Sequence, residues 1–278
     1  MKLKKLLSAY KVKLLGSHAR LVRTKLIGRE FLVYDGTIVE KVDKDDAWFF
    51  ALSRHHDNIF DIGANIGYTT ILASLTNAHK KVVLVDPNPD ALTYASGNLI
   101  RNNLSVNKIF VPCFVSEKSG EKVKFFTVGA GAAGSMFASA AESARMSNSF
   151  YWVDTMTVDD IVNMTGVTPD FVKVDVEGAE SFVLKGATRL AAMHQTKFFV
   201  EMHAPDEMPM LKNASLVLDW CKANNYTPYY LKEHSEMATA AMIAHRGKCH
   251  LLLVPQGQEY PSYLRNIQEG AALPTELL

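Results

Sequence analysis

The sequence predicts an α/β fold with a doubly wound, mainly parallel, Rossmann-like sheet. From residue 57 onward, short apolar runs rich in β-branched residues alternate with amphipathic helical patterns. This alternation is typical of a parallel sheet that carries helices on both faces. The composition, with 48% hydrophobic and 21% charged residues, is that of a globular protein and excludes a disordered or fibrous chain.

The elements of this fold can be assigned in chain order. Strands are expected at residues 58–61, 82–86, 108–115, 171–175, 198–203 and 250–254. Helices are expected at residues 44–56, 64–77, 89–103, 158–165, 178–192 and 209–225. Before them, Asp35-Gly36 separates two β-prone runs and predicts a hairpin over residues 31–39. Because such sheets bind ligands at the carboxyl ends of their strands, functional residues should follow the strands directly.

The length of 278 residues fits one catalytic domain with terminal additions. We expect an N-terminal extension at residues 1–56, a catalytic domain at residues 57–255 and a C-terminal tail at residues 256–278. The Gly- and Ala-rich segment 129–149 is read either as a mobile substrate lid or as a plain flexible loop.

The net charge of +1 is unevenly distributed, because residues 1–29 hold nine Lys or Arg and no acid, which leaves the rest at −8. The acidic body argues against a nucleic-acid substrate. The basic segment has apolar residues at helical spacing, and we expect an amphipathic helix that docks on the body. Peripheral contact of residues 1–29 with a membrane or another anionic surface is the alternative. With no signal-like or membrane-spanning run, the expected location is the cytoplasm.

Two segments predict a nucleoside-binding site. The first strand ends in Asp61 and continues as Ile-Gly63-Ala-Asn65-Ile-Gly67, a turn that lacks the G-x-G-x-x-G spacing of dinucleotide-binding proteins. The second strand ends in Asp86, where an acid accepts hydrogen bonds from ribose hydroxyls in nucleoside-binding folds. Together they indicate a nucleoside ligand without a pyrophosphate group.

Two further strand ends collect charged residues. Lys173, Asp175 and Glu177 alternate along one strand and share a face if the chain stays extended. Glu201 and His203 share a face of the next strand. Such a cluster is costly at a strand end unless its members are paired or functional.

These segments resemble, in order and spacing, the FkbM-type methyltransferases. The matching motifs are DIGANIG at residues 61–67, TVDD at 157–160, KVDVEGAE at 173–180, LKGA at 184–187 and EMH at 201–203. The resemblance spans about residues 57–254, and it implies a class I methyltransferase fold, S-adenosyl-L-methionine as methyl donor, and O-methylation of a sugar or natural-product hydroxyl. One departure is Asp86, where the family more often has Glu.

We therefore predict the following roles. The cofactor-binding candidates are Asp61, Gly63, Asn65, Gly67, Asp86, Asn88 and Ser116. The acceptor is expected to be a small-molecule or glycan hydroxyl, with Glu180 and Ser135 as its binding candidates. Asp175 or His203 is expected to act as the base in an in-line displacement, with Lys173 balancing the acids and with Glu177 and Glu201 orienting the histidine or binding hydroxyls.

Three alternatives stay open. The acids could hold a divalent metal, for which Mg²⁺ suits the oxygen ligands, but their spacing does not identify one. An NAD-linked oxidoreductase would share the fold, although the dinucleotide fingerprint is missing. A non-catalytic nucleoside-binding module would also share it, although the strand-end cluster is intact.

Overall fold

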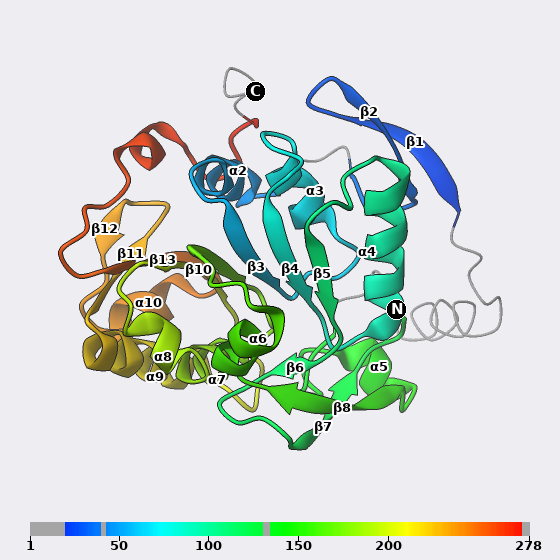
Figure 1. Ribbon diagram of the computed structural model, residues 1–278. Helices are drawn as coiled ribbons and strands as arrows, with labels where there is room; N and C mark the ends of the chain where they lie inside the picture. Colours follow the sequence, from blue (N-terminus) through cyan, green and yellow to red (C-terminus); the bar gives the residue numbers. More distant parts are fainter. Residues whose placement is uncertain (1–19, 40–42, 130–133, 274–278) are drawn as a thin grey trace.

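The computed structural model describes residues 20–39, 43–129 and 134–273, and its centre is an eight-stranded sheet (Figure 1). The strand order is β12-β11-β13-β10-β9-β3-β4-β5. The strands are β3 (Asn58–Ile62), β4 (Lys81–Val85), β5 (Lys108–Val111), β9 (Phe171–Val174), β10 (Lys197–Met202), β11 (Tyr226–Tyr230), β12 (Ser235–Glu236) and β13 (Cys249–Pro255). The five strands from β10 to β5 run parallel, and β13 pairs antiparallel with β10. The predicted fold class is confirmed.

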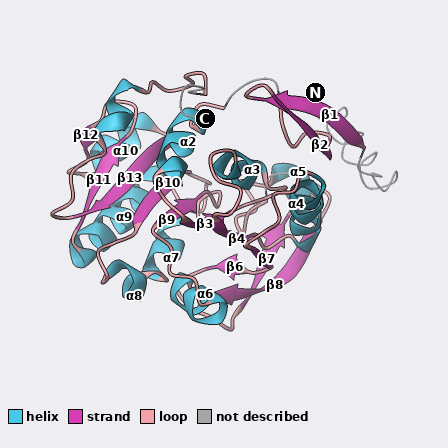
Figure 2. Ribbon diagram, turned by 45° about the horizontal axis from the view of Figure 1, so that its top comes forward, coloured by secondary structure: helices cyan, strands magenta, loops and turns pink. Residues whose placement is uncertain are grey.

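Helices cover both faces of this sheet (Figure 2). One layer contains α2 (Asp46–Arg54), α3 (Tyr68–Ser74) and α4 (Pro89–Arg101), and the other contains α6 (Val158–Thr165), α7 (Glu180–Lys185), α8 (Thr188–Ala191), α9 (Met210–Asn224) and α10 (Ala240–Arg246). Each layer of helices encloses its own hydrophobic core with the sheet. Because side chains alternate along a strand, Ile59 of β3 packs in the core under α2, α3 and α4, while Phe60 and Ile62 pack in the core on the other face. A short 3-10 helix, Ser262–Asn266, adds Leu264 to the core under α2, α3 and α4.

A three-stranded sheet lies beyond the carboxyl end of β5 (Figure 1). It consists of β6 (Phe114–Val115), β8 (Phe150–Met156) and β7 (Lys122–Phe126), in the order β6-β8-β7. The single strand predicted at 108–115 is therefore wrong. It divides at Pro112, which has no N–H to donate to a ladder, and the chain then joins the second sheet. The predicted insertion 129–149 connects β7 to β8 and contains α5 (Glu142–Met146), while its residues 130–133 are outside the described part.

The predicted hairpin is also misplaced by several residues. The two strands are β1 (Leu21–Leu26) and β2 (Arg29–Tyr34), and their turn is Ile27-Gly28, with φ angles of 47° and 72°. Asp35-Gly36 follows β2 instead. The residues after Asp35-Gly36 do not form a third strand beside β2, because α4 occupies that side. Asn98 of α4 accepts from the Tyr34 N–H and donates to the Thr37 hydroxyl.

Two predicted helices are shorter than expected. The helix predicted at 64–77 begins at Tyr68, because Asn65 and Gly67 both take positive φ angles. The helix predicted at 178–192 divides into α7 and α8, since Asp159 caps the second part by accepting from the backbone N–H groups of Arg189 and Leu190. The basic helix, predicted from the spacing of Leu3, Leu6, Leu7, Tyr10 and Leu14, lies outside the described residues. Among the residues that are described, no helix is long and apolar enough to cross a membrane.

Candidate active site

The candidate site lies where the strand order reverses, between β3 and β9. From β3 the sheet continues through β4 and β5 on one side, while β9 and β10 pair on the other side. This reversal opens a crevice at the carboxyl ends of the strands, which is where open α/β sheets bind ligands. Asp61, Asp86, Asp175 and His203 lie at or just after the ends of four neighbouring strands. The topology therefore brings the predicted motifs together.

Gly63 allows the ends of β3 and β9 to approach each other. Its φ angle is 84°, and a Cβ atom added there would lie 1.8 Å from the carbonyl oxygen of Asp175. Gly67, whose φ angle is 86°, allows the start of α3 to pack closely on α4, since an added Cβ would lie 2.9 Å from the Cβ of Ala95. Each position needs glycine for its backbone angle and for the close contact.

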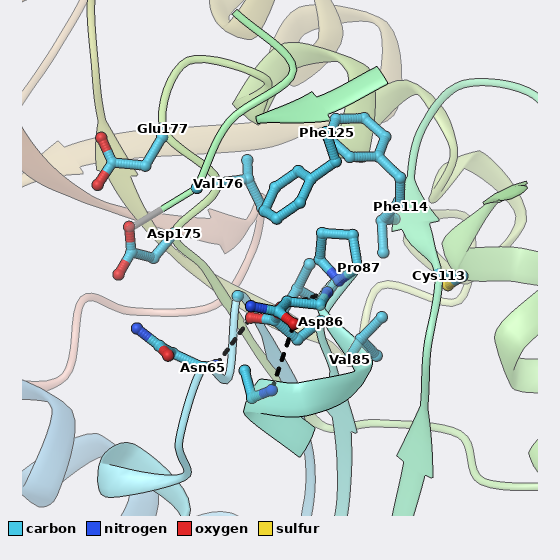
Figure 3. Close-up of a pocket in the computed structure, with 16 residues that line it drawn as sticks. Asn65, Val85, Asp86, Pro87, Cys113, Phe114, Phe125, Asp175, Val176 and Glu177 are labelled. Atoms are coloured by element: carbon cyan, nitrogen blue, oxygen red, sulfur yellow. Dashed lines mark hydrogen bonds between the residues drawn. The ribbon is translucent and has the colours of Figure 1, made fainter. Parts of the chain in front are cut away.

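A cleft of about 680 Å³, open to solvent, begins at this loop (Figure 3). The described residues that line it are Ile62, Gly63, Asn65, Val85, Asp86, Pro87, Asn88, Ala91, Cys113, Phe114, Val115, Phe125, Gly134, Asp175, Val176 and Glu177. Figure 3 shows the side chains of Phe114, Phe125 and Val176 on the apolar side of the cleft, apart from Asp86 and Asn65. The cleft thus combines an apolar wall with a few polar groups.

Asp86 is the buried acid of this cleft. Its Oδ2 accepts from the backbone N–H of Asn65 at 2.9 Å, and its Oδ1 accepts from the backbone N–H of Asn88 at 2.8 Å. Burial raises the pKa of Asp86 to about 6, although these two hydrogen bonds act in the opposite direction. Each oxygen of an ionised carboxylate has a second lone pair, so Asp86 can still accept from a ligand.

Asn88 caps α4, because its side-chain oxygen accepts from the N–H groups of Asp90 and Ala91. Asn65 has a different feature: its Oδ1 is buried, has no hydrogen-bond partner in the described structure, and belongs to a residue of the cleft wall. Buried polar atoms are normally paired, so this oxygen is suited to a ligand that brings a donor.

Three predicted cofactor residues lie outside the cleft lining. Asp61 is fully buried, and its Oδ2 accepts from the hydroxyls of Thr69 and Thr70 at 2.6 and 2.8 Å. Gly67 packs on α4 as described above. Ser116 lies one residue beyond the cleft lining, with its N–H donating to Met156 in β8.

His203 lies at the centre of the acidic cluster. Its Nδ1 donates to Glu180 at 3.0 Å, and Glu180 also accepts from the Gly178 N–H and from the side chain of Asn213. Its Nε2 lies 4.0 Å from Asp175 and 3.6 Å from Glu177. Burial would lower the pKa of His203, but Glu180 and the nearby carboxylates outweigh it and raise the pKa to about 9.

Lys173 balances the other side of the cluster. Its ammonium is buried and lies 3.1 Å from Asp175 and 3.9 Å from Asp61. Burial alone would lower its pKa, but the two carboxylates raise it above the ordinary value. Lys173 therefore stays charged and fixes Asp175 against the end of β3. The chain then leaves the extended conformation at Glu177, whose φ angle is 54°.

Glu201 links His203 to a second group of charges. Its Oε1 lies 3.7 Å from His203 Nε2, 2.6 Å from Lys248 Nζ and 3.5 Å from His250 Nε2. His250 also lies 3.7 Å from Asp45, which comes from the turn before α2. Burial raises the pKa of Asp45 to about 6. Burial would also raise the pKa of Glu201, but the neighbouring His250, His203 and Lys248 lower it well below the ordinary value.

Two more cavities meet the cleft at the end of β9. One, of about 860 Å³, shares Gly63, Asn65 and Asp175 with the cleft and also contains Lys173 and Glu201. The other, of about 500 Å³, shares Glu177 with the cleft and also contains His203. The segment 175–177 therefore lies where the cleft and the two cavities meet.

Several site residues were not among the predicted ones. The apolar wall comes from Phe114 and Phe125, which belong to the second sheet that the sequence pattern did not reveal. Asp45 and His250 join the site through tertiary packing, and His250 pairs with Glu201 across β13 and β10. Ser135, a predicted substrate residue, donates instead to the carbonyl oxygen of Glu177 at 3.0 Å and is buried.

Comparison with known proteins agrees with this geometry. A family model described as the methyltransferase FkbM domain matches residues 61–240. The chain belongs to the FkbM methyltransferase family. The resemblance inferred from the motifs is thereby confirmed, and the match includes all the predicted site residues.

Solved structures similar to this FkbM family member are distant. An FkbM methyltransferase from Methylobacillus flagellatus KT is 19% identical, with a TM-score of 0.44, and the match covers 71% of this chain and 43% of that one. TYW2 of M. jannaschii, solved with AdoMet, is 13% identical, with a TM-score of 0.40 and 84% coverage of both chains. A tRNA (uracil-54, C5)-methyltransferase of Pyrococcus abyssi, solved with S-adenosyl-L-homocysteine, is 13% identical, with a TM-score of 0.44 and coverage of 84% and 43%. A search of curated proteins found no match.

The cleft fits the cofactor that the family resemblance implies. A nucleoside needs an apolar surface for its base and an acceptor for its ribose hydroxyls, which Phe114, Phe125 and Asp86 provide. Asn65 adds an unpaired oxygen at the same wall. The glycine at position 63 lets the ends of β3 and β9 approach each other, which brings Asp175 to the same cleft.

Proposed function

We propose that this FkbM methyltransferase family member transfers a methyl group from S-adenosylmethionine to a hydroxyl oxygen. The observation that carries the proposal is the position of the segment 175–177, because Asp175 lines the nucleoside cleft and the second cavity while Glu177 lines the cleft and the third cavity. A group at this junction can touch both a cofactor and an acceptor. When bound, the cofactor would supply a methyl group on a sulfonium sulfur, and the chain has to align an acceptor oxygen with it.

The cleft and the second cavity would divide the cofactor between them. Asp86 would hold the ribose hydroxyls while the apolar wall holds the adenine. The methionyl end carries an ammonium, which the acids of the second cavity can pair with. Asn65 and Gly63 line both spaces and would face the middle of the cofactor.

The acceptor would enter through the third cavity, beside Glu177 and His203. Of the two base candidates, Asp175 suits the role better. Because the pKa of His203 is raised to about 9, its imidazole already carries a proton at neutral pH and cannot take another. Asp175, held by Lys173, can accept the hydrogen bond of a hydroxyl group. Glu180 would then orient His203, and Ser135 would support the backbone of Glu177 rather than contact the acceptor.

Calorimetry with S-adenosylhomocysteine tests the cofactor, and mass spectrometry of a panel of sugar and natural-product hydroxyls tests the reaction. We expect Asp86→Ala to weaken cofactor binding by about tenfold or more. Asp175→Asn should lower turnover about 10²-fold or more with little change in cofactor affinity. Binding of NAD in place of S-adenosylhomocysteine, or methyl transfer to nitrogen or carbon only, would contradict the proposal.

The nature of the acceptor follows from the charge of the site. The described residues of the third cavity include the acids Glu177 and Asp206 and no Lys or Arg. We therefore propose a neutral, hydroxyl-rich small molecule or glycan as the acceptor, and not a nucleic acid. Contact of residues 1–29 with a membrane stays a prediction.

A further inference from the structure

The side chain of His203 is held by hydrogen bonds in the way that is typical of a metal-binding histidine. Its Nδ1 is bound to Glu180, which is itself held by Asn213 and the Gly178 N–H. A histidine that donates one ring N–H to a fixed carboxylate presents its other nitrogen in a set direction, as in many metal sites. That other nitrogen, Nε2, is buried and has no hydrogen-bond partner in the described structure, and the residue is only 7% exposed.

Three carboxylates lie within 4.0 Å of this nitrogen, and Asp175 and Glu177 are the two of them that line the cofactor cleft. Asp175 Oδ1 is 4.0 Å from Nε2 and Glu177 Oε2 is 3.6 Å from it, and one ligand atom from each of these two residues and from His203 lies within 4.8 Å of the others. Donor atoms bonded to one ion at about 2.0–2.2 Å are separated by about 3–4 Å. Small side-chain rotations would therefore bring all three donors to a shared ion.

The backbone also aims one of these ligands. Glu177 has a φ angle of 54°, which is costly for a residue with a Cβ atom, and the hydrogen bond from Ser135 to its carbonyl oxygen helps to hold it there. This conformation directs the carboxylate of Glu177 toward His203 instead of continuing β9. The side chains of Asp175 and Glu177 are 28% and 30% exposed, which leaves an open side for an acceptor.

We propose that Asp175, Glu177 and His203 bind a divalent first-row transition-metal ion, which would take the place of the proton on His203 Nε2. Carboxylates alone would suit Mg²⁺, but an imidazole ligand shifts the preference toward ions such as Mn²⁺ or Zn²⁺. The role of the ion rests on the proposed function: it would hold the acceptor oxygen beside the cofactor cleft. Binding of the ion itself does not depend on that function.

A second group of donors provides the internal comparison. Asp45, Glu201 and His250 also bring one ligand atom each within 4.8 Å of the others. There, however, the oxygen that faces His250, Glu201 Oε1, is itself paired with the Lys248 ammonium at 2.6 Å, which repels a cation. In the His203 group the Lys173 ammonium pairs with Asp175 Oδ2, whereas the oxygen that faces His203 is Oδ1. We therefore assign the ion to the His203 group, and the experiment must separate the two.

The test uses Mn²⁺ with the full-length chain, freed of metal by a chelator. Electron paramagnetic resonance should show one tightly bound ion per chain, and the electron spin-echo modulation of a directly bound imidazole nitrogen should be present. His203→Ala should remove that nitrogen signal. Glu177→Gln, which keeps the side-chain shape, should weaken Mn²⁺ binding about 10–100-fold. The exposed residues His79 and Glu236 supply matched controls, since His79→Ala and Glu236→Gln should change neither the signal nor the affinity.

These measurements distinguish the His203 group from the His250 group. A nitrogen signal that survives in His203→Ala and disappears in His250→Ala would move the ion to the other group and overturn the proposal. Weak binding that none of the variants changes would also overturn it. Calorimetry with S-adenosylhomocysteine on the same protein keeps the two proposals separate. If it binds and Mn²⁺ does not, only the metal site fails; if Mn²⁺ binds with the nitrogen signal and S-adenosylhomocysteine does not, the proposed function fails and the metal site stands.

Discussion

Replacing Gly63 by alanine should damage both the fold and the site, because the added methyl group has no space. The φ angle of 84° costs an alanine about 1–2 kcal/mol. Its Cβ would also lie 1.8 Å from the Asp175 carbonyl oxygen, whereas Cβ atoms essentially never approach closer than 3.0 Å. The end of β9 must then move by more than about 1 Å, and forcing extra volume into packed structure costs about 1–3 kcal/mol.

The expected loss for Gly63→Ala is therefore about 2–5 kcal/mol in the free energy of unfolding. Gly257→Ala is the matched control, since Gly257 has a φ angle of 90° and nothing within 4 Å of its added Cβ. It should lose only the backbone contribution of about 1–2 kcal/mol. Urea unfolding followed by circular dichroism measures both variants under the same conditions.

The same displacement should weaken the ligand site, because Gly63 and Asp175 both line the cleft. We expect S-adenosylhomocysteine to bind Gly63→Ala about tenfold or more weakly, which corresponds to about 1.4 kcal/mol. Gly257→Ala should bind it as the wild type does. If the two variants lose equal stability, within about 0.5 kcal/mol, the close contact between β3 and β9 is refuted.

Three further predictions concern other parts of the site. The pKa of Asp86 is raised to about 6, and a ribose is best accepted by the ionised form. S-adenosylhomocysteine affinity should therefore be full about one pH unit above the pKa and fall as the pH drops through 6. In Asp86→Asn, calorimetry should find weaker binding that is flat over the same range, and a parallel pH profile in both proteins would contradict the assignment. The side chain of Asn213 is fully buried and donates to Glu180 at 2.6 Å and to the His203 carbonyl oxygen at 3.1 Å. Asn213→Ala should therefore lower the free energy of unfolding by about 1–3 kcal/mol. Asn224→Ala, on the same helix, is the control and should have a smaller effect. Lys173→Met leaves Asp61 and Asp175 without their buried cation and should lower the free energy of unfolding by about 3–5 kcal/mol, measured by urea unfolding. The double variant with Asp61→Asn should recover part of that loss. No recovery would mean that the Asp61 contact contributes little.

The part of the site that could be predicted from the sequence is the part that depends on local pattern. Asp86, Asp175 and His203 each follow an apolar run, and parallel strands align their carboxyl ends, so proximity follows from the fold class alone. Gly63 was predicted for the same reason, as a turn residue after a strand. The reason it must be glycine, the carbonyl of Asp175 on a strand more than a hundred residues away, is visible only in the folded chain.

The rest depends on contacts that no local pattern encodes. His250 reaches Glu201 only because β13 inserts antiparallel beside β10. Asp45 comes from the turn before α2, a helix that packs on the same face of the sheet as His250. The apolar wall was missed because Pro112 breaks an apparently continuous strand and sends Phe114 into another sheet. Those events are set by sheet order and by tertiary packing, which composition and periodicity leave open.

The charges of the site bear on which nucleoside cofactor it suits. Among the described residues that line the cleft, the ionisable carboxyl groups are Asp86, Asp175 and Glu177, and no Lys or Arg accompanies them. Lys173, in the adjoining cavity, is already paired with two acids. A pyrophosphate group would bring negative charge into this field, and the turn before α3 lacks the G-x-G-x-x-G spacing that receives such a group. A sulfonium or a metal ion brings positive charge, so the excess of carboxylates that would repel a dinucleotide favours the cofactor and the ion proposed above.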